Sequence, residues 1–579
     1  MLKTKQRCLK TIVLSLLMVC MVMVCLMQQG NLFPRAYASK GGNAEVEETA
    51  MELQINNPAM KINGIEKEID PGKGTAPILV NGTDRKTIIS NQQSNNINAA
   101  QGLIRFSVVE PQSKYPRGLK VSERYRVLVK PVSDNTPWDT SAHLTATYDA
   151  WPDYRDPEHT PRAYVDNHVH IAQVDASERV RVRVELIDES VIDTIKLKPS
   201  RYTEMRSTQE NGQNWVEFEI DASVFTKHVL VEINAPEQGP YSDGLVIFVN
   251  PISKMPKGNV LVLPSGIVDS SHPAMNDINA IIIEEDSPYD AMYIPQDTIV
   301  DGRIQVIKKG FKIAGRGMVI GSRWKWGRRA EDWREGNYDR EISPDGSILK
   351  PIVKGSENME VEGITTIHPY HFNYEGAISY TNAKAFGWRF TSDAFHGTII
   401  RGCFARVNDD STYCNKGVIE HCTIWAMQNG SPFQLGWGQN AANAGGGTRV
   451  TACNIVRGDW RTNNANNAVF SSRLGCNGDL KDVRFEDIRV DGTVSRFISY
   501  AMAKHTGKLE NFVFKNIWFE NAPTYKSFED GSHITNFLQC GGGIEGFVFD
   551  NVVIGGKKIR SIDDLEPLEQ KNIGKITFK

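Results

Sequence analysis

Residues 512–519 read Phe-Val-Phe-Lys-Asn-Ile-Trp-Phe, and residues 547–554 read Phe-Val-Phe-Asp-Asn-Val-Val-Ile, which is nearly the same pattern. Four earlier segments share this layout of apolar residues around one Cys, Asn or Asp, with Ile or Val near the end. They are residues 400–407, 418–425, 450–457 and 483–490. Successive segments start about 18 to 35 residues apart, and self-similarity at this period, built from strand-like stretches, predicts a solenoid of stacked parallel strands.

Stacking accounts for the repeated pattern, because one coil of a solenoid cannot bury its apolar side alone. Successive coils place like residues over like, so the recurrent Cys, Asn or Asp is expected to form a ladder at a bend. Cys403, Cys422 and Cys453 occupy this position and are predicted to be buried thiols rather than disulfides. We expect a right-handed parallel β-helix over residues 256–579, with a second β-sandwich as the alternative.

The region before the repeats alternates charged and apolar residues with the period of half-buried strands. The strands are expected at residues 103–109, 124–129, 180–186, 215–220, 229–233 and 245–249. Short alternating strands separated by Pro, Gly and Asn predict an N-terminal antiparallel β-sandwich domain over residues 61–255. A polar tether at residues 39–60 precedes it. The fold class is therefore all-β, and 579 residues are enough for two domains.

Residues 1–38 have the three parts of a secretory signal peptide: a basic start, an apolar run at residues 11–27, and the small-x-small sequence Ala36-Tyr37-Ala38. The alternative is an uncleaved membrane anchor. The chain has 66 basic and 69 acidic residues, and removing the five basic residues of this segment, which has no acidic ones, leaves a net charge of −8. A mildly acidic product argues against nucleic acid as a partner. We expect a secreted, extracellular monomer that is free of the membrane after cleavage.

Cysteine usage and motifs point away from metals and cofactors. Six of the nine cysteines follow the signal peptide, namely Cys403, Cys414, Cys422, Cys453, Cys476 and Cys540. They include no Cys-x-x-Cys pair for zinc, and the chain has no Gly-rich phosphate loop, dinucleotide fingerprint or Ser, His, Asp order. His168-Val-His170 could ligate a metal from one strand face, but no third ligand is evident. We therefore predict ordinary histidines, no metal and no cofactor.

Carboxylates and sugar-binding side chains gather between Trp388 and Trp437. Asp393 lies in this stretch, and Asp409-Asp410 follows about one coil later. An inverting glycosidase needs one carboxylic acid to protonate the leaving oxygen and a separate carboxylate to activate water, and adjacent carboxylates raise each other's pKa. The alternative for an Asp-Asp pair is a solvated turn, which we assign to Asp563-Asp564. The nearby aromatic and amide residues that could line a sugar site are Trp388, Trp425, Asn429, Gln434 and Trp437.

The motif Val407-Asn-Asp-Asp410, followed by Thr423-Ile-Trp425, Asn429 and Gln434-Leu-Gly-Trp437, resembles the signature of glycoside hydrolase family 49. That family contains secreted dextranases and isopullulanases, and it is related to the family 28 polygalacturonases, which share a triad of aspartates. The segment 245–251 also resembles the end of the family's N-terminal sandwich, and the segment 313–321 resembles an early coil of its helix. The resemblance is continuous over about residues 240–460.

When the roles of the family's residues are applied to the matching positions, the resemblance implies that Asp409 is the general acid. It implies that Asp393 and Asp410 hold and deprotonate the nucleophilic water. It further implies inversion at the anomeric carbon and no metal. Two departures concern the substrate. The family follows its aspartate pair with Ala-Ile-Lys, whereas this chain has Ser411-Thr-Tyr413, so a cationic contact is missing or supplied elsewhere. Arg457 stands where the family has His, and Asp459 where it has Arg.

The sequence therefore predicts an endo-acting hydrolase of α-glucan, with the α-1,6 linkages of dextran first and pullulan second. We expect His371, one coil before the aspartates, and Arg457 to contact this polysaccharide substrate together with the aromatic and amide residues above. The alternatives are a β-helix hydrolase of another glycan such as pectin, a β-helix polysaccharide lyase, and a non-catalytic glycan-binding surface protein. A lyase would need Ca²⁺ and a basic residue acting on an acidic polymer, which the net charge disfavours.

Overall fold

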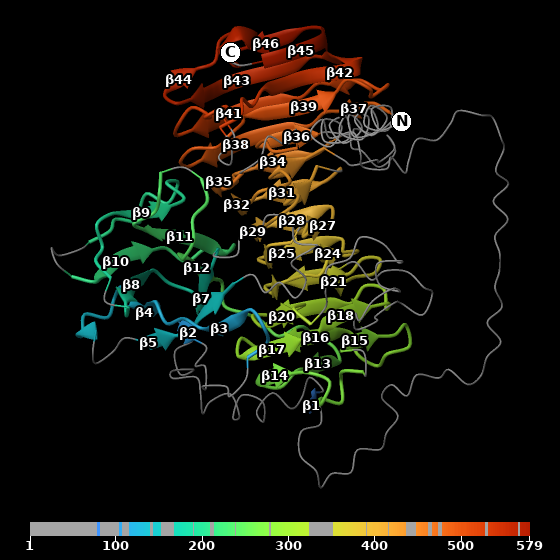
Figure 1. Ribbon diagram of the computed structural model, residues 1–579. Coiled ribbons are helices and arrows are strands. Elements are labelled where there is room, and N and C mark those ends of the chain that lie inside the picture. The colour runs from blue at the N-terminus through green and yellow to red at the C-terminus, as the bar shows by residue number, and fades with distance from the viewer. Residues whose placement is uncertain are drawn as a thin grey trace, which may run out of the picture. The chain divides into compact units, whose positions relative to one another are not determined.

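The structure is a computed structural model that describes residues 78–80, 104–106 and most of 115–579. Within 115–579 it leaves out residues 139–142, 152–166, 189, 209–212, 238, 277–278, 324–350, 390, 415, 436–446, 461–465, 473–477, 527–530 and 566–567. The predicted signal peptide and tether lie outside the described residues. In the described part, no helix is long and apolar enough to span a membrane. The predicted fold class is confirmed, because a β-sandwich precedes a long parallel β-helix (Figure 1).

The sandwich consists of two sheets whose alternating apolar side chains meet in one core. The four-stranded sheet has the order β10 (Trp215–Ile220), β8 (Val180–Leu186), β4 (Tyr125–Pro131) and β5 (His143–Thr145). The other sheet has the order β3 (Leu119–Val121), β6 (Thr147–Ala150), β7 (Val169–Ala176), β12 (Gly244–Asn250), β11 (Lys227–Ile233) and β9 (Ile195–Lys198), with β2 (Ile104–Phe106) also on β7. On β8, every second residue from Val180 to Leu186 is buried in this core.

One pairing in the sandwich differs from the antiparallel arrangement that we predicted. Strands β7 and β12 run parallel, with Val169 opposite Gly244 and Asp175 opposite Asn250. A parallel pair needs a long crossover, and here the chain passes through β8 to β11 between the two strands. Alternation of apolar residues shows which positions are buried but carries no information about the direction of the neighbouring strand.

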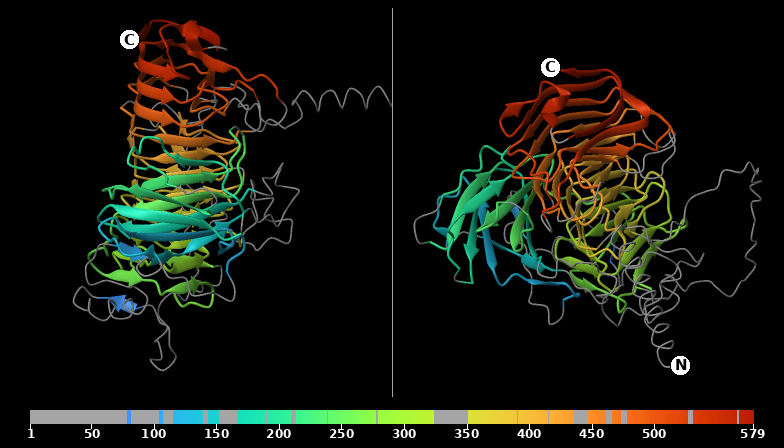
Figure 2. Two further views of the ribbon diagram at one scale, coloured as in Figure 1. Left: turned by 90° about the vertical axis from the view of Figure 1, so that its left-hand side faces the viewer. Right: turned by 45° about the horizontal axis from the view of Figure 1, so that its top comes forward.

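The β-helix winds two long sheets around a shared apolar interior, and its coils stack as parallel rungs (Figure 2). The first sheet has the order β1 (Ile78–Val80), β13 (Val260–Val262), β14 (Gly266–Val268), β16 (Ala291–Ile294), β17 (Thr298–Asp301), β19 (Lys312–Gly315), β20 (Met318–Ile320), β22 (Glu360–Glu362), β23 (Thr365–Ile367), β25 (Ser379–Thr381), β26 (Lys384–Gly387), β28 (Ile399–Arg401), β29 (Phe404–Val407), β31 (Val418–Glu420), β32 (Thr423–Ala426), β34 (Arg449–Thr451), β35 (Asn454–Gly458), β38 (Arg484–Val490), β41 (Val513–Phe519), β43 (Phe547–Ile554), β44 (Lys557–Lys558) and β46 (Ile576–Phe578).

The second sheet of the helix contains the strands that follow the catalytic candidates. Its order is β15 (Ala280–Ile283), β18 (Arg303–Val306), β21 (Pro351–Lys354), β24 (Phe372–Glu375), β27 (Phe395–His396), β30 (Thr412–Tyr413), β33 (Phe433–Gln434), β36 (Phe470–Ser472), β39 (Ile498–Met502), β42 (Asn536–Glu545), β40 (Leu509–Glu510) and β37 (Leu480–Lys481), with β45 (Leu568–Ile573) on β42. The short helix η1 (Ile562–Leu565) follows β44 and contains the Asp563-Asp564 pair.

The predicted ladder at the bend proves to be two neighbouring rows. Five residues at equivalent positions have a left-handed backbone, with φ between 53° and 56°: His421, Ala452, Asp487, Asn516 and Asn551. Cys422 and Cys453 follow one residue later and point inward, where Cys453 is level with Ile488. The sequence prediction treated Cys, Asn and Asp as one ladder because they are only one position apart in the repeat. Asn and Asp favour the left-handed bend, whereas Cys favours the interior. Cys403, Cys422 and Cys453 are buried thiols, as predicted, and Cys414 and Cys540 are also buried and form no disulfide. Cys476 lies outside the described residues.

The sandwich packs on the outward face of the first helical sheet. Phe386 and Phe404 of the helix contact Phe248 of the sandwich, with ring centroids 6.2 and 5.2 Å apart. Buried polar contacts surround this apolar patch, including an ion pair of 3.0 Å between Arg316 Nε and Asp175 Oδ1. The interface therefore covers one side of the coils that carry the catalytic candidates.

Candidate active site

The candidate site lies at one corner of the β-helix, where strands of the first sheet turn into strands of the second. Asp393 precedes β27, Asp409 and Asp410 precede β30, Ser431 precedes β33, and Asn466 precedes β36. Backbone hydrogen bonds join these turns, from Ala394 N to Asp410 O at 3.0 Å and from Ser411 N to Ser431 O at 2.9 Å. Because coils stack in register, residues distant in sequence converge here. The structure thus brings together the three aspartates selected from the sequence.

Asp393 is held by two side chains that sequence reasoning did not place in the site. The hydroxyl of Tyr413 donates to Asp393 Oδ2 at 2.5 Å, and His396 Nε2 lies 3.2 Å from the same oxygen. Tyr413 comes from the next coil, and its ring centroid lies 4.7 Å from that of His396. Asp393 as a whole is 4% exposed. The signal that could have identified Tyr413 is its position, since it replaces the lysine that follows the aspartate pair in family 49.

Asp410 is fully buried and accepts hydrogen bonds on one oxygen from two neutral donors. Its Oδ1 accepts from Ser431 N at 2.9 Å and from Asn466 Nδ2 at 3.1 Å. Its Oδ2 lies 3.1 Å from the Tyr413 hydroxyl. Burial, followed by the negative charge of Asp393, raises the pKa of Asp410 to about 7. Asp410 therefore has an environment that favours its protonated form in mildly acidic solution.

Asp409 differs from the other two aspartates because it is partly exposed. Its Oδ2 accepts a hydrogen bond from Thr391 N at 2.9 Å, and its Oδ1 accepts from Asp410 N at 3.0 Å. Although part of the residue is exposed, its carboxyl group is largely enclosed by the site, and this burial, followed by the charges of Asp393 and Asp410, raises the pKa of Asp409 well above its usual range. A carboxyl group that holds its proton and reaches solvent is suited to donate that proton to a ligand.

Thr391 has a backbone conformation that is unfavourable for its residue type. Its φ is 62°, in the left-handed region, where a β-branched side chain crowds the backbone. This conformation accompanies the hydrogen bond from Thr391 N to the Asp409 carboxyl group. Strain of this kind, roughly 1–3 kcal/mol, gathers at functional sites, where the surrounding structure holds the residue in place.

Asn408 forms hydrogen bonds that join three consecutive turns of the β-helix next to the aspartates. Its Nδ2 donates to Trp388 O at 2.7 Å, and its Oδ1 accepts from Asn429 N at 3.0 Å. Its own backbone N–H donates to Ser392 Oγ at 3.0 Å. These bonds fix the spacing of the coils that carry Asp393 and the Asp409-Asp410 pair.

Three residues predicted to contact sugar are buried against the sandwich instead. Trp388 is 1% exposed and donates from Nε1 to Asn167 O at 2.7 Å. Trp425 is fully buried and donates to Asp459 Oδ2 at 2.6 Å. Arg457 pairs with Glu232 of the sandwich at 2.9 Å. The prediction that these side chains bind substrate does not fit this placement, because outward-facing residues of the first sheet are covered by the other domain.

The remaining predicted contact residues lie closer to the corner. Gln434 is buried and donates to Asn466 Oδ1 at 2.9 Å, which places it behind Asp410. Asn429 is partly exposed. His371 packs edge-on against Phe372, whose ring centroid lies 4.6 Å from that of His396. Trp437 lies outside the described residues.

The two histidines weighed as metal ligands have other partners. His168 Nδ1 lies 2.8 Å from Asp149 Oδ1, and His170 Nδ1 lies 3.0 Å from Ser122 Oγ. In the parts of the chain that the structure describes, no three or more His, Cys, Asp and Glu side chains are grouped to hold a metal ion.

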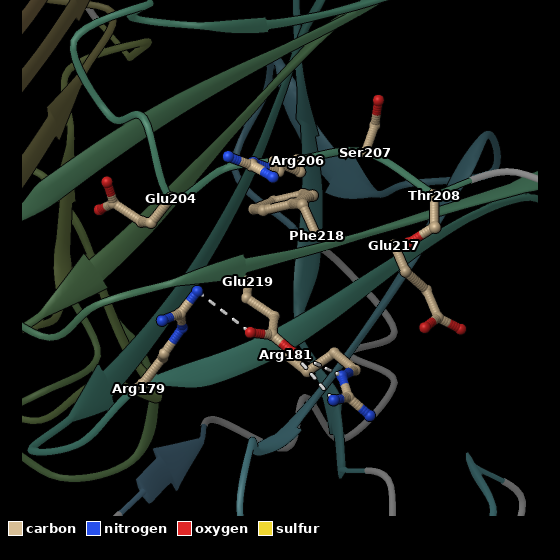
Figure 3. Close-up of a pocket in the computed structure, with 9 residues that line it drawn as sticks. All are labelled: Arg179, Arg181, Glu204, Arg206, Ser207, Thr208, Glu217, Phe218 and Glu219. Carbon is tan, nitrogen blue, oxygen red and sulfur yellow. Dashed lines mark hydrogen bonds and ion pairs between the residues drawn. The ribbon is translucent and has the colours of Figure 1, made fainter.

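A separate pocket of about 330 Å³ opens on β8 and β10 of the sandwich (Figure 3). Most of its charged side chains are already paired: Glu219 contacts Arg181 at 2.8 Å and Arg179 at 3.1 Å. Glu204 and Glu217 pair with Lys227 and Arg183, which lie outside the lining. Paired charges of this kind leave little to recognise a ligand, and we assign no function to this pocket.

No protein-family model matches this chain, and no curated protein sequence matches it. Among solved structures, the chain is similar to Dex49A from Penicillium minioluteum, a family 49 dextranase, with a TM-score of 0.64 and 15% sequence identity. The match covers 84% of this chain and 100% of that chain. The two proteins share a fold. The resemblance predicted from the motif is thereby confirmed at the level of the fold.

Proposed function

We propose that this protein is a secreted, endo-acting hydrolase of α-glucan, with dextran as the first substrate and pullulan as the second. The observation that carries the proposal is the convergence of Asp393, Asp409 and Asp410 on consecutive coils at one corner of the helix. The fold shared with a dextranase supports the same conclusion. Secretion rests on the signal-like sequence of residues 1–38.

Asp409 is the general acid in this proposal. It is the aspartate of the three that reaches solvent, and its raised pKa keeps a proton available for the leaving glycosidic oxygen. The backbone donors Thr391 N and Asp410 N hold the carboxyl group in one orientation, so the proton is delivered from a fixed position. Positioning of this kind contributes to catalysis because no reorientation is needed in the transition state.

The second function needed is activation of water on the opposite side of the sugar. Asp393 and Asp410 share the Tyr413 hydroxyl, which places both carboxyl groups at the same point of the corner. A water bound there would attack the anomeric carbon as Asp409 protonates the leaving oxygen, which is single displacement with inversion.

A neutral polysaccharide suits the charges that the described residues contribute. The hydrogen-bond donors Tyr413, Ser431 N, Asn466 and Thr391 N that contact the three carboxyl groups carry no charge, and the carboxyl groups themselves are acidic. A polygalacturonate chain carries a carboxylate on every sugar and would be repelled by such a site. This charge balance favours a glucan over pectin.

The test is release of reducing ends by the purified mature protein from dextran, pullulan and polygalacturonate. We expect release from dextran or pullulan. Release from polygalacturonate alone would assign the protein to pectin, and ultraviolet absorbance from an unsaturated product would identify a lyase. Binding to a glycan without any cleavage would overturn the proposal.

Inversion is tested on a short oligosaccharide that the protein cleaves. Proton NMR during the first minutes of cleavage should show the β-anomer as the initial product of an α-linked substrate, before mutarotation mixes the forms. Initial accumulation of the α-anomer would contradict single displacement.

A further inference from the structure

Tyr413 touches two carboxyl groups but has one proton to donate. Its hydroxyl oxygen lies 2.5 Å from Asp393 Oδ2 and 3.1 Å from Asp410 Oδ2. The shorter distance is that of a hydrogen bond from a hydroxyl to an ionised carboxylate. The phenolic proton is therefore directed to Asp393. The longer contact with Asp410 Oδ2 can be made by sharing the phenolic proton or by a proton on Asp410, and the second arrangement gives each contact a hydrogen bond of its own.

The other oxygen of Asp410 agrees with this assignment. Asp410 Oδ1 accepts from Ser431 N and from Asn466 Nδ2, so it acts as the carbonyl-like oxygen of the group. The carboxylic proton of Asp410 is therefore assigned to Oδ2, which faces the phenolic oxygen of Tyr413. Asp393 Oδ2, by contrast, accepts the phenolic proton of Tyr413 and lies 3.2 Å from His396 Nε2.

We propose that Tyr413 is a positioning residue that gives Asp393 and Asp410 different roles: Asp393 is the ionised base, and Asp410 is a neutral acid that donates its proton to the Tyr413 oxygen. This inference rests on the proposed hydrolase function and refines it, because the resemblance to family 49 assigns water activation to both aspartates jointly. The direction of the pKa of Asp410, which burial raises to about 7, agrees with a protonated Asp410.

The hydrolytic step then balances with one proton acceptor and one proton donor. Water forms a bond to the anomeric carbon and loses a proton to Asp393, while the bond from that carbon to the leaving oxygen breaks and Asp409 transfers its proton to that oxygen. Asp393 ends protonated and Asp409 ends ionised, and exchange with solvent restores both. Asp410 and Tyr413 keep their protons throughout and hold Asp393 in place.

A lysine in place of Tyr413 would not give the two aspartates different roles. An ammonium group carries three protons and a positive charge, so it could donate to both carboxylates and keep both ionised. A phenol carries one proton and no charge. The charged and titratable groups of the described residues that face Tyr413 are Asp393 and His396 on the preceding coil and Asp409 and Asp410 on its own coil.

The variants Asp393→Asn and Asp410→Asn separate the two roles. An asparagine at 410 can accept from Ser431 N and Asn466 Nδ2 with its oxygen and donate to the Tyr413 oxygen with its amide, as protonated Asp410 does. We expect kcat of Asp410→Asn to fall by no more than about tenfold and that of Asp393→Asn to fall by at least about a thousandfold, the loss typical of removing a general base. Equal losses in the two variants would overturn the proposal.

A second measurement is independent of activity and tests the proton positions directly. Infrared spectra of the mature protein at about pH 6 should contain carbonyl stretching bands of protonated carboxyl groups. Asp410→Asn should remove one band that Asp393→Asn does not remove, and Tyr413→Phe should shift that band because Asp410 loses its acceptor. Spectra of wild type and Asp410→Asn without this difference would contradict the proposal. If the protein cleaves none of the polysaccharides, the hydrolase function fails while the infrared result still decides the proton positions.

Discussion

The hydroxyl of Tyr413 lies 2.5 Å from Asp393 Oδ2, although the two residues belong to different coils and are 20 positions apart in sequence. Strand β30 places Tyr413 directly after the Asp409-Asp410 turn, and the coil before it carries Asp393 at the same corner. The family motif that this chain resembles has a lysine at this position, so the sequence predicts a cationic contact that is missing or supplied elsewhere. In the structure, the Tyr413 hydroxyl makes a contact at this position. It has one proton to donate, whereas a lysine ammonium group has three.

Stability should decrease as the pH rises toward neutrality. Asp410 has a pKa of about 7 in the folded protein against 3.8 for an ordinary aspartate, because of burial and the charge of Asp393. Between these values the folded chain holds a proton that the unfolded chain has released, so this stabilisation is complete below about pH 4 and is lost through about pH 7. The slope is up to about 1.4 kcal/mol per pH unit for this group.

The measurement is the free energy of urea unfolding between about pH 5 and about pH 8. Asp410→Asn should make the decrease shallower, because the amide does not titrate. Identical pH profiles for wild type and this variant would show that Asp410 has an ordinary pKa in the folded state.

The buried charges between the domains should be essential for stability. Glu232 is 2% exposed and contacts Lys198 Nζ at 3.0 Å and Arg457 Nη1 at 2.9 Å. Glu232→Gln removes the charge that compensates two buried cations, which we expect to cost about 3–5 kcal/mol in chemical denaturation. The matched control is Glu357→Gln, which breaks an exposed pair with Lys309 and should leave the unfolding free energy unchanged. Equal effects would argue against the interface as described.

The cysteines of the helix should resist modification while the protein is folded. Cys403, Cys422 and Cys453 are buried, and burial raises the pKa of the Cys422 and Cys453 thiols well above the usual range. Iodoacetamide should therefore leave these residues unlabelled in native protein and label them in guanidinium, as followed by peptide mass mapping. Peptides joined by a disulfide in the denatured, unreduced sample would show that the thiols are not free.

Trp388 should contribute to stability and not to substrate affinity. Its ring stacks on His368, with centroids 4.6 Å apart, and its Nε1 donates to Asn167 O across the domain interface. We expect Trp388→Phe to lower the unfolding free energy by about 1–3 kcal/mol, because a buried acceptor is left unpaired. KM for the polysaccharide should be unchanged in steady-state kinetics. A large rise in KM without loss of stability would restore the role of a sugar platform.

The strand positions and the corner of the β-helix that carries the three aspartates were predictable from the sequence, because both depend on local patterns. The segment 512–519 became β41 and the segment 547–554 became β43, since apolar residues in a repeated layout must stack to be buried. Once the coils are known to stack, Asp393 and the Asp409-Asp410 pair, about one coil apart, must lie at neighbouring positions.

The other features depend on contacts between residues that are far apart in the sequence, and a single sequence does not reveal such contacts. Trp388 and Trp425 resemble sugar platforms until the sandwich is seen to cover the face that carries them. The bond from Asn466 to Asp410 joins residues 56 positions apart, across a connection of variable length. A periodic sequence pattern cannot predict where Asn466 lies, although the fold brings its Nδ2 within 3.1 Å of Asp410 Oδ1.

The most direct test of the account concerns Asp409 as the general acid. Asp409→Asn and the control Asp563→Asn, which changes an exposed aspartate of η1, are compared with wild type on the polysaccharide that the protein cleaves fastest. We predict that Asp409→Asn lowers kcat/KM for release of reducing ends by at least about a thousandfold, with no decrease in melting temperature, and that Asp563→Asn has no effect. Asp409→Asn activity equal to that of wild type and the control would contradict the account.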